Sequence, residues 1–183
     1  MRELKRPVLA ALLGLVCVAT GTHADDASEL KQFVDQYKCS IVERLILLHS
    51  APQNRNRFLI VEMDDREQSF VQCLFPDSRP RENKLYCEAA SGAYEARRSK
   101  EAYVPLPETA LGALARLGFA TDNTDRNHSL ELAYRGPDDF DKVAVLLLTA
   151  LYQAYGARLG RPLTLNAPLA RIDLRQSRCV PTS

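Results

Sequence analysis

The segment SFVQCLFPDSRPRENKLYCEAASGAY, residues 69–94, decides the fold, because it holds two alternating stretches with one cysteine in each. Alternation of apolar and polar residues predicts strands over 68–75 and 84–91, joined by a polar turn that contains proline. Placing Phe75 opposite Leu85 makes every pair on one face apolar, whereas a shift of one residue mixes the two faces. The pairs on that face are then Phe75–Leu85, Cys73–Cys87 and Val71–Ala89. The segment therefore predicts an antiparallel hairpin in a single register.

The cysteines of this hairpin face each other at the separation that a disulfide spans, so we predict a Cys73–Cys87 bond. The alternative is a pair of buried free thiols. Outside the N-terminal 24 residues the chain has two more cysteines, Cys39 and Cys179, and we expect these to form the remaining pair. That second bond either closes within the chain or bridges two subunits. An even number of cysteines in an exported chain favours disulfides, although four cysteines allow three pairings.

The N-terminal residues 1–24 are predicted to be a signal peptide. A basic start, MRELKR, precedes the apolar run PVLAALLGLVCVATG, and THA supplies small residues before Asp25. The apolar run is short for a transmembrane helix, so we expect no stable membrane span after cleavage. An uncleaved anchor or lipidation at Cys17 is the alternative, although Val16 does not suit a lipidation motif. The expected location is the periplasm or the extracellular medium.

The remaining chain predicts one domain over residues 25–159 and an extended C-terminal tail over 160–183. The order of elements is αβββαβα, which implies an α+β fold: a three-strand meander plus at least one further strand, packed against helices. Asp26 and Glu29 have the spacing of a capping box, and Gly118 is expected to end the second helix. The predicted helices cover 27–49, 107–117 and 137–158, and the predicted strands cover 57–63, 68–75, 84–91 and 128–134.

The first helix carries two apolar strips. The wide strip faces the core and consists of Leu30, Phe33, Val34, Tyr37, Ile41, Leu45 and Leu48. A narrower strip with Cys39, Val42 and Ile46 lies on the other side of the same helix. Either the C-terminal tail or a second subunit should cover it, so a homodimer is one of the two expectations.

The charge of the chain argues against a nucleic-acid partner. The whole chain has 24 basic and 23 acidic residues, and the signal peptide holds three of the basic and one of the acidic ones, which leaves a net charge of −1. Nucleic-acid binders are basic overall or over one face. We expect the basic clusters RNR (55–57), RPRENK (79–84) and ARRSK (96–100) to be solvated loop charges.

No pattern in the chain predicts catalysis. After the signal peptide the only histidines are His49 and His128, and no metalloprotease, nucleophile-elbow, dithiol or phosphate-loop motif occurs. His49 suits the end of a helix, and His128 begins a strand. We therefore expect no catalytic residues, no metal site and no cofactor.

The order of elements, together with FVQ (70–72), CEAASGAY (87–94) and LARLGF (114–119), resembles the TY-Chap family. These are bacterial domains similar to type III secretion chaperones, and the resemblance covers roughly residues 30–159. It implies a chaperone-like α/β sandwich that is often dimeric and that binds a protein or peptide. Secretion chaperones are cytoplasmic and acidic, whereas this chain has an export signal and is near neutral, so a binding role would operate outside the cytoplasm.

Two hypotheses for the binding surface follow. In the first, the sheet face opposite the helices binds a peptide or protein through Phe70, Gln72, Leu74, Tyr86 and Glu88, since such mixtures of rings and polar groups are typical of recognition surfaces. The alternative for this face is that the C-terminal tail or a second subunit covers it. In the second, the protein is an inhibitor or envelope accessory protein whose 76–84 hairpin loop, with Arg79 and Arg81, plugs a site on its partner.

Overall fold

The structure is a computed structural model, and it describes residues 22–52, 56–65, 68–76, 83–93, 105–122, 125–172, 177 and 179. The predicted signal peptide up to residue 21 lies outside the described residues. So do Arg79 and Arg81 of the hairpin loop and the basic cluster at 96–100.

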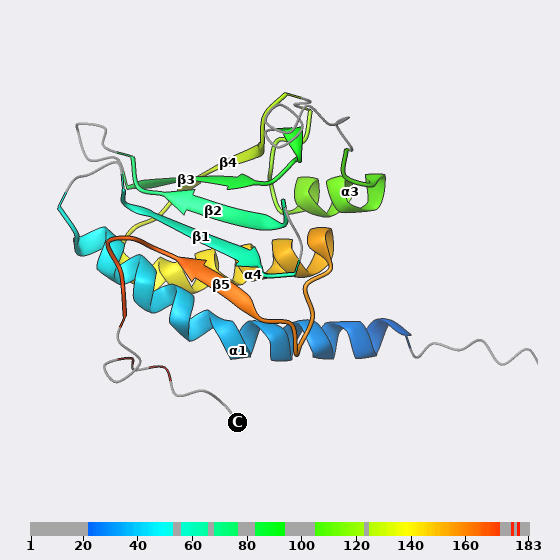
Figure 1. Cartoon of the computed structure of the whole chain (residues 1–183), viewed down its shortest axis with the longest axis horizontal. Coiled ribbons are helices and arrows are strands. Elements are labelled where there is room, and N and C mark those ends of the chain that lie inside the picture. Colours follow the sequence, from blue (N-terminus) through cyan, green and yellow to red (C-terminus); the bar gives the residue numbers. More distant parts are fainter. Residues whose placement is uncertain are drawn as a thin grey trace, which may run out of the picture.

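In this described part of the chain, five strands form one antiparallel sheet with the order β4-β3-β2-β1-β5 (Figure 1). The α+β class and the order αβββαβα are confirmed. The fifth strand comes from the segment that the sequence assigned to the tail, and it extends the sheet by pairing Leu165 with Val61 of β1. The strands are β1 (Phe58–Met63), β2 (Phe70–Leu74), β3 (Lys84–Ala89), β4 (His128–Ala133) and β5 (Leu163–Asn166).

The described helices are α1 (Thr22–Ser50), α3 (Glu108–Arg116) and α4 (Phe140–Tyr155), and the short 3-10 turn η1 (Pro137–Asp139) leads into α4. Glycine ends two of them. Gly118 follows α3 with a φ of 93°, and Gly156 follows α4 with a φ of 75°. A positive φ costs glycine little, so the chain can turn back and satisfy the last carbonyls of the helix. After α4 this is seen as a hydrogen bond from the Ala157 amide to the Leu151 carbonyl, 3.1 Å long.

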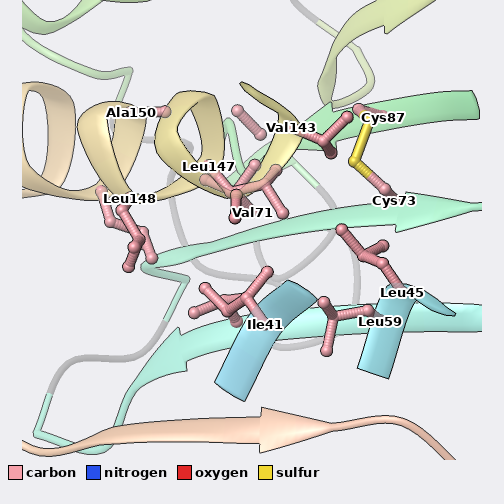
Figure 2. Close-up of a cluster of buried hydrophobic side chains, with 14 of the residues drawn as sticks. Ile41, Leu45, Leu59, Val71, Cys73, Cys87, Val143, Leu147, Leu148 and Ala150 are labelled. Atoms are coloured by element: carbon pink, nitrogen blue, oxygen red, sulfur yellow. A yellow bond between two sulfur atoms is a disulfide. The ribbon is translucent and has the colours of Figure 1, made fainter. Parts of the chain in front are cut away.

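Helices α1 and α4 pack against each other and against the same face of the sheet (Figure 1). The wide apolar strip of α1 faces this core as predicted: Phe33, Ile41, Leu45 and Leu48 are fully buried. Leu147 and Leu148 of α4 belong to the same buried cluster as Val71 of β2, and Leu147 lies beside Val71 (Figure 2). Burial of this apolar surface between the two layers is the main driving force for the fold.

The β2–β3 hairpin has the predicted register. Cys73 lies opposite Cys87, Val71 opposite Ala89, and Leu74 opposite Tyr86. The two cysteines form a disulfide that is buried within the core cluster (Figure 2). A second disulfide joins Cys39 of α1 to Cys179, across a sequence separation of 140 residues. Two disulfides are consistent with an oxidising compartment.

The expected capping box is wrong, because α1 begins at Thr22 and Asp26 therefore lies inside the helix. Asp26 and Glu29 instead accept hydrogen bonds from the hydroxyl of Tyr152 on α4, at 2.7 and 3.2 Å. The polar residues that seemed to start a helix locally thus tie two helices together.

Candidate functional site

The candidate site is the sheet face that points away from α1 and α4. Strands β1, β2 and β3 each alternate between buried and half-buried side chains. The buried set packs under the helices, so the half-buried set belongs to the other face. We call this set the open face; its members are Phe58, Ile60 and Glu62 of β1, Phe70, Gln72 and Leu74 of β2, and Lys84, Tyr86 and Glu88 of β3.

The register places the open-face residues in cross-strand rows. Tyr86, Leu74 and Phe58 lie opposite one another along one row. Glu88, Gln72 and Ile60 form the next row. Side chains that face each other on adjacent strands are in contact range, so rings and aliphatic groups adjoin across three strands. All five residues predicted for the binding face therefore share one surface.

Two polar groups of the open face, on Gln72 and Tyr86, are held in place by one carboxylate. Glu88 accepts a hydrogen bond of 2.6 Å from the side-chain amide of Gln72 and one of 3.3 Å from the hydroxyl of Tyr86. These contacts orient the Tyr86 ring next to Leu74 on the neighbouring strand. Lys84 lies farther along β3 and forms an ion pair of 2.9 Å with Glu131 of β4. The face thus combines a fixed polar centre with an apolar surround.

The C-terminal tail was one candidate cover for this face, and its described residues lie elsewhere. Cys179 is bonded to Cys39 on α1. Arg171 and Ile172 line a groove of about 690 Å³ together with the narrow apolar strip of α1. The tail therefore packs on the helical layer, as the first of the two expectations for that strip proposed. It covers the strip only in part, since Ile46 remains 39% exposed.

Arg57 is a structural residue that the sequence analysis missed. The expectation of a solvated loop charge is wrong for it, because it is only 8% exposed. Its guanidinium donates to the carbonyls of Leu48 and His49, at 3.0 and 3.2 Å, and lies 5.0 Å from the ring centre of Phe75. A cation at the carboxyl end of a helix satisfies carbonyls that have no partner within the helix. The sequence RNR (55–57) after a helix does not show which of its side chains folds back to bind the carbonyls at the end of that helix.

An aromatic cluster adjoins Arg57 where α1 ends. The His49 ring lies 5.6 Å from Tyr134 and 5.6 Å from Phe140, and the Tyr134 hydroxyl is 3.3 Å from Nδ1 of His49. Phe75, the last predicted residue of its strand, packs against the rings of Tyr134 and Phe140. His49 therefore stabilises the junction of the helix with the sheet.

His128 lies at the start of β4, opposite Ala89, and is 2% exposed. Both ring nitrogens are buried, and the backbone of Ala120 interacts with the ring. Burial lowers the pKa of this imidazole, so the neutral form is favoured. A histidine can activate a cysteine as a nucleophile only if that cysteine is a free thiol. Cys39, Cys73, Cys87 and Cys179 are all in disulfides. Within the described ranges, no group of three or more histidine, cysteine or acidic residues could hold a metal ion.

Comparison with known proteins gives no relative: no protein family, no curated protein and no solved structure matches the chain. None of the helices in the described part is both long and apolar enough to cross a membrane.

Proposed function

We propose that this protein is an exported, non-catalytic module that binds a protein or peptide in the periplasm. The observation that carries the proposal is the open face, where Phe70, Leu74 and Tyr86 lie around the hydrogen-bonded Gln72–Glu88 pair. Aromatic side chains supply contact area at low entropic cost, and oriented polar groups add direction. The resemblance to chaperone-like TY-Chap domains supports the same conclusion.

Export is part of the proposal. The basic and apolar start of the chain has the pattern of a signal peptide, and two disulfides join distant and neighbouring segments of the domain. Disulfides persist in oxidising compartments such as the periplasm. We further propose that the surface acts without cofactor or metal, through side-chain contacts alone.

The test replaces two anchors of the open face. A photo-crosslinking side chain at position 86 should capture periplasmic partners. A crosslinker at position 72 should capture the same partners in the parent, but should no longer capture them in the variant Leu74→Ser, Tyr86→Ala. Leu47→Ser is the matched control, because Leu47 is an exposed apolar residue on α1. Circular dichroism should show the same fold for all variants. A folded Leu74→Ser, Tyr86→Ala variant that captures the same proteins as the parent would rule out this face.

The alternative hypothesis, a loop that plugs a partner's site, predicts the opposite pattern. Replacing Arg79 and Arg81 with alanine should then abolish capture, while the open-face variant keeps it. The two sets of variants thus separate binding by the sheet from binding by the 76–84 loop.

A further inference from the structure

Strand β4 lies at one edge of the sheet. It pairs with β3 on one side through six register positions, from Lys84 opposite Ala133 to Ala89 opposite His128. On its other side, the described residues form one isolated bridge, between Ser129 and Ala120. An edge strand with free backbone groups is a template for a further strand.

The hydrogen bonds show which residues of β4 point to the free side. The Tyr134 amide donates to the Asn83 carbonyl at 2.8 Å, so Tyr134 points toward β3. In an antiparallel pair the direction alternates, and Leu132 and Leu130 therefore also point toward β3. The Ala120 amide donates to the Ser129 carbonyl at 2.8 Å, which confirms that the odd-numbered residues point away from β3.

Glu131 and Ala133 consequently present their amides and carbonyls to the outside. Both residues are exposed, and within the described residues no hydrogen bond to their outward backbone groups is seen. The Glu131 side chain is engaged elsewhere, in its ion pair with Lys84. The outward amides and carbonyls of these two residues can therefore form backbone hydrogen bonds with one added strand, either antiparallel or parallel to β4.

A cavity of about 540 Å³ lies beside this free edge, between β4 and α4. Its apolar walls come from Leu132 of β4 and from Val143 and Leu146 of α4. Alternate side chains of a strand laid along β4 would point toward the helical layer and enter the cavity. The edge thus offers backbone hydrogen bonds and an apolar pocket for the same extended ligand.

The rim of the cavity sets the charge of that ligand. Arg135, Lys142 and Asp139 line it, and Asp139 already accepts hydrogen bonds from the Lys142 ammonium at 2.7 Å and from the Arg135 amide at 2.9 Å. Two cations and one engaged carboxylate leave a net positive rim. An acidic residue next to an apolar one therefore complements the site.

The length of the edge favours a peptide over a second copy of the domain. The free stretch runs from Leu130 to Tyr134, about 17 Å for five residues, because the Arg135 amide already donates to Asp139. It is bounded by the Ala120 bridge at one end and by the turn into η1 at Gly136 and Pro137 at the other. A stable interface between two domains buries at least about 1,200 Å², whereas a single short strand needs only the edge and its pocket.

We propose that β4 binds an extended peptide segment of a partner as a sixth strand, with an apolar side chain in the cavity beside α4 and an acidic residue at its rim. This site is separate from the open face and goes beyond the function proposed for that face. It can bind whether or not the open face does.

Amide hydrogen exchange tests the geometry and the binding together. In the free protein the Leu130 and Leu132 amides should exchange slowly and the Glu131 and Ala133 amides quickly. Peptides selected from a phage-displayed library of random ten-residue sequences should slow exchange at Glu131 and Ala133 at least about tenfold, as a new hydrogen bond of about 1.4 kcal/mol would. Fast exchange at Leu132 in the free protein, or no selected peptide, would overturn the proposal.

Two variants identify the backbone contact. Ala133→Pro removes an outward amide without touching the β3–β4 ladder, and should weaken the selected peptides about tenfold or more. Ala133→Gly keeps that amide and should bind within about threefold of the parent. If Ala133→Pro does not fold, a selected peptide carrying an N-methyl group at its central residue replaces it, and it too should bind about tenfold more weakly.

Other outcomes separate this site from its competitors. Peptides that lose affinity with Tyr86→Ala but not with Ala133→Pro would support the open face and overturn the β4 site. Protection of Glu131 and Ala133 that rises with protein concentration, without peptide, would show that a second copy occupies the edge, and the proposal would again be wrong.

Discussion

Cys73 of β2 and Cys87 of β3 lie directly opposite each other with their Cα atoms 4.0 Å apart, and their sulfur atoms are bonded. Both residues are fully buried under the helical layer. The bond therefore fixes the register of the hairpin at its centre, where a slip of one residue would move every buried side chain of the strand to the open face.

Non-reducing peptide mapping should find Cys73 linked to Cys87 and Cys39 linked to Cys179. Alkylation before denaturation should label none of these four residues, since all are in disulfides. A link from Cys73 to Cys39 or Cys179 would contradict the register of the hairpin.

Removing the long-range disulfide with Cys39→Ala and Cys179→Ala should lower the free energy of unfolding by about 2–5 kcal/mol, because the bond closes a very long loop and restricts the unfolded chain. Urea denaturation followed by circular dichroism measures the change. The parent protein under reducing conditions serves as the comparison, and an unchanged midpoint for the variant would show that the tail does not stabilise α1.

Leu147→Ala should lower the free energy of unfolding by about 2–5 kcal/mol, because Leu147 is fully buried between α4 and the sheet. Val145→Ala is the matched control on the same helix, since Val145 is 39% exposed. That change should cost no more than about 0.5 kcal/mol. Equal losses in urea denaturation would mean that the buried face of α4 is misplaced.

Arg57→Met should lower the free energy of unfolding by about 1.5–3 kcal/mol, because methionine keeps much of the volume but cannot donate to the carbonyls of Leu48 and His49. Arg126→Met is the control. Its side chain is 62% exposed and is paired with Asp125 at the surface, so the change should be within about 0.5 kcal/mol. A thermal melt in which both variants match the parent would argue against the contact at the end of α1.

His128 should make the protein less stable as the pH falls. Burial lowers the pKa of His128 in the folded state, so the unfolded chain, with a pKa near about 6.5, binds the proton more readily. The stability due to the neutral ring is present above about pH 6.5 and is lost as the pH falls from there toward the folded pKa. His128→Leu should show a smaller loss of stability between about pH 7.5 and 5.5. Parallel curves for the variant and the parent would mean that His128 does not titrate differently on unfolding.

Much of the fold could be predicted from the chain because its signals are local. Alternation with a cysteine in each strand predicts the hairpin and its register, and the spacing of Phe33, Ile41 and Leu45 predicts the buried strip of α1. The same alternation places Phe70, Leu74 and Tyr86 on one face, because side chains two residues apart point the same way. These patterns depend on residues that are close in the sequence or that face each other across one hairpin turn.

Only the tertiary structure decided what depends on distant segments. Residues 163–166 form a strand because β1 offers a free edge beside them, and nothing in LTLN requires that pairing. Arg57 is buried because α1 ends next to it, and Asp26 contacts Tyr152 because two helices cross. The free edge of β4 likewise follows from the order of the strands, with β3 on one side and, in the described part of the chain, one bridge to Ala120 on the other. Local preferences of the backbone specify each element, whereas packing of the apolar faces chooses its neighbours.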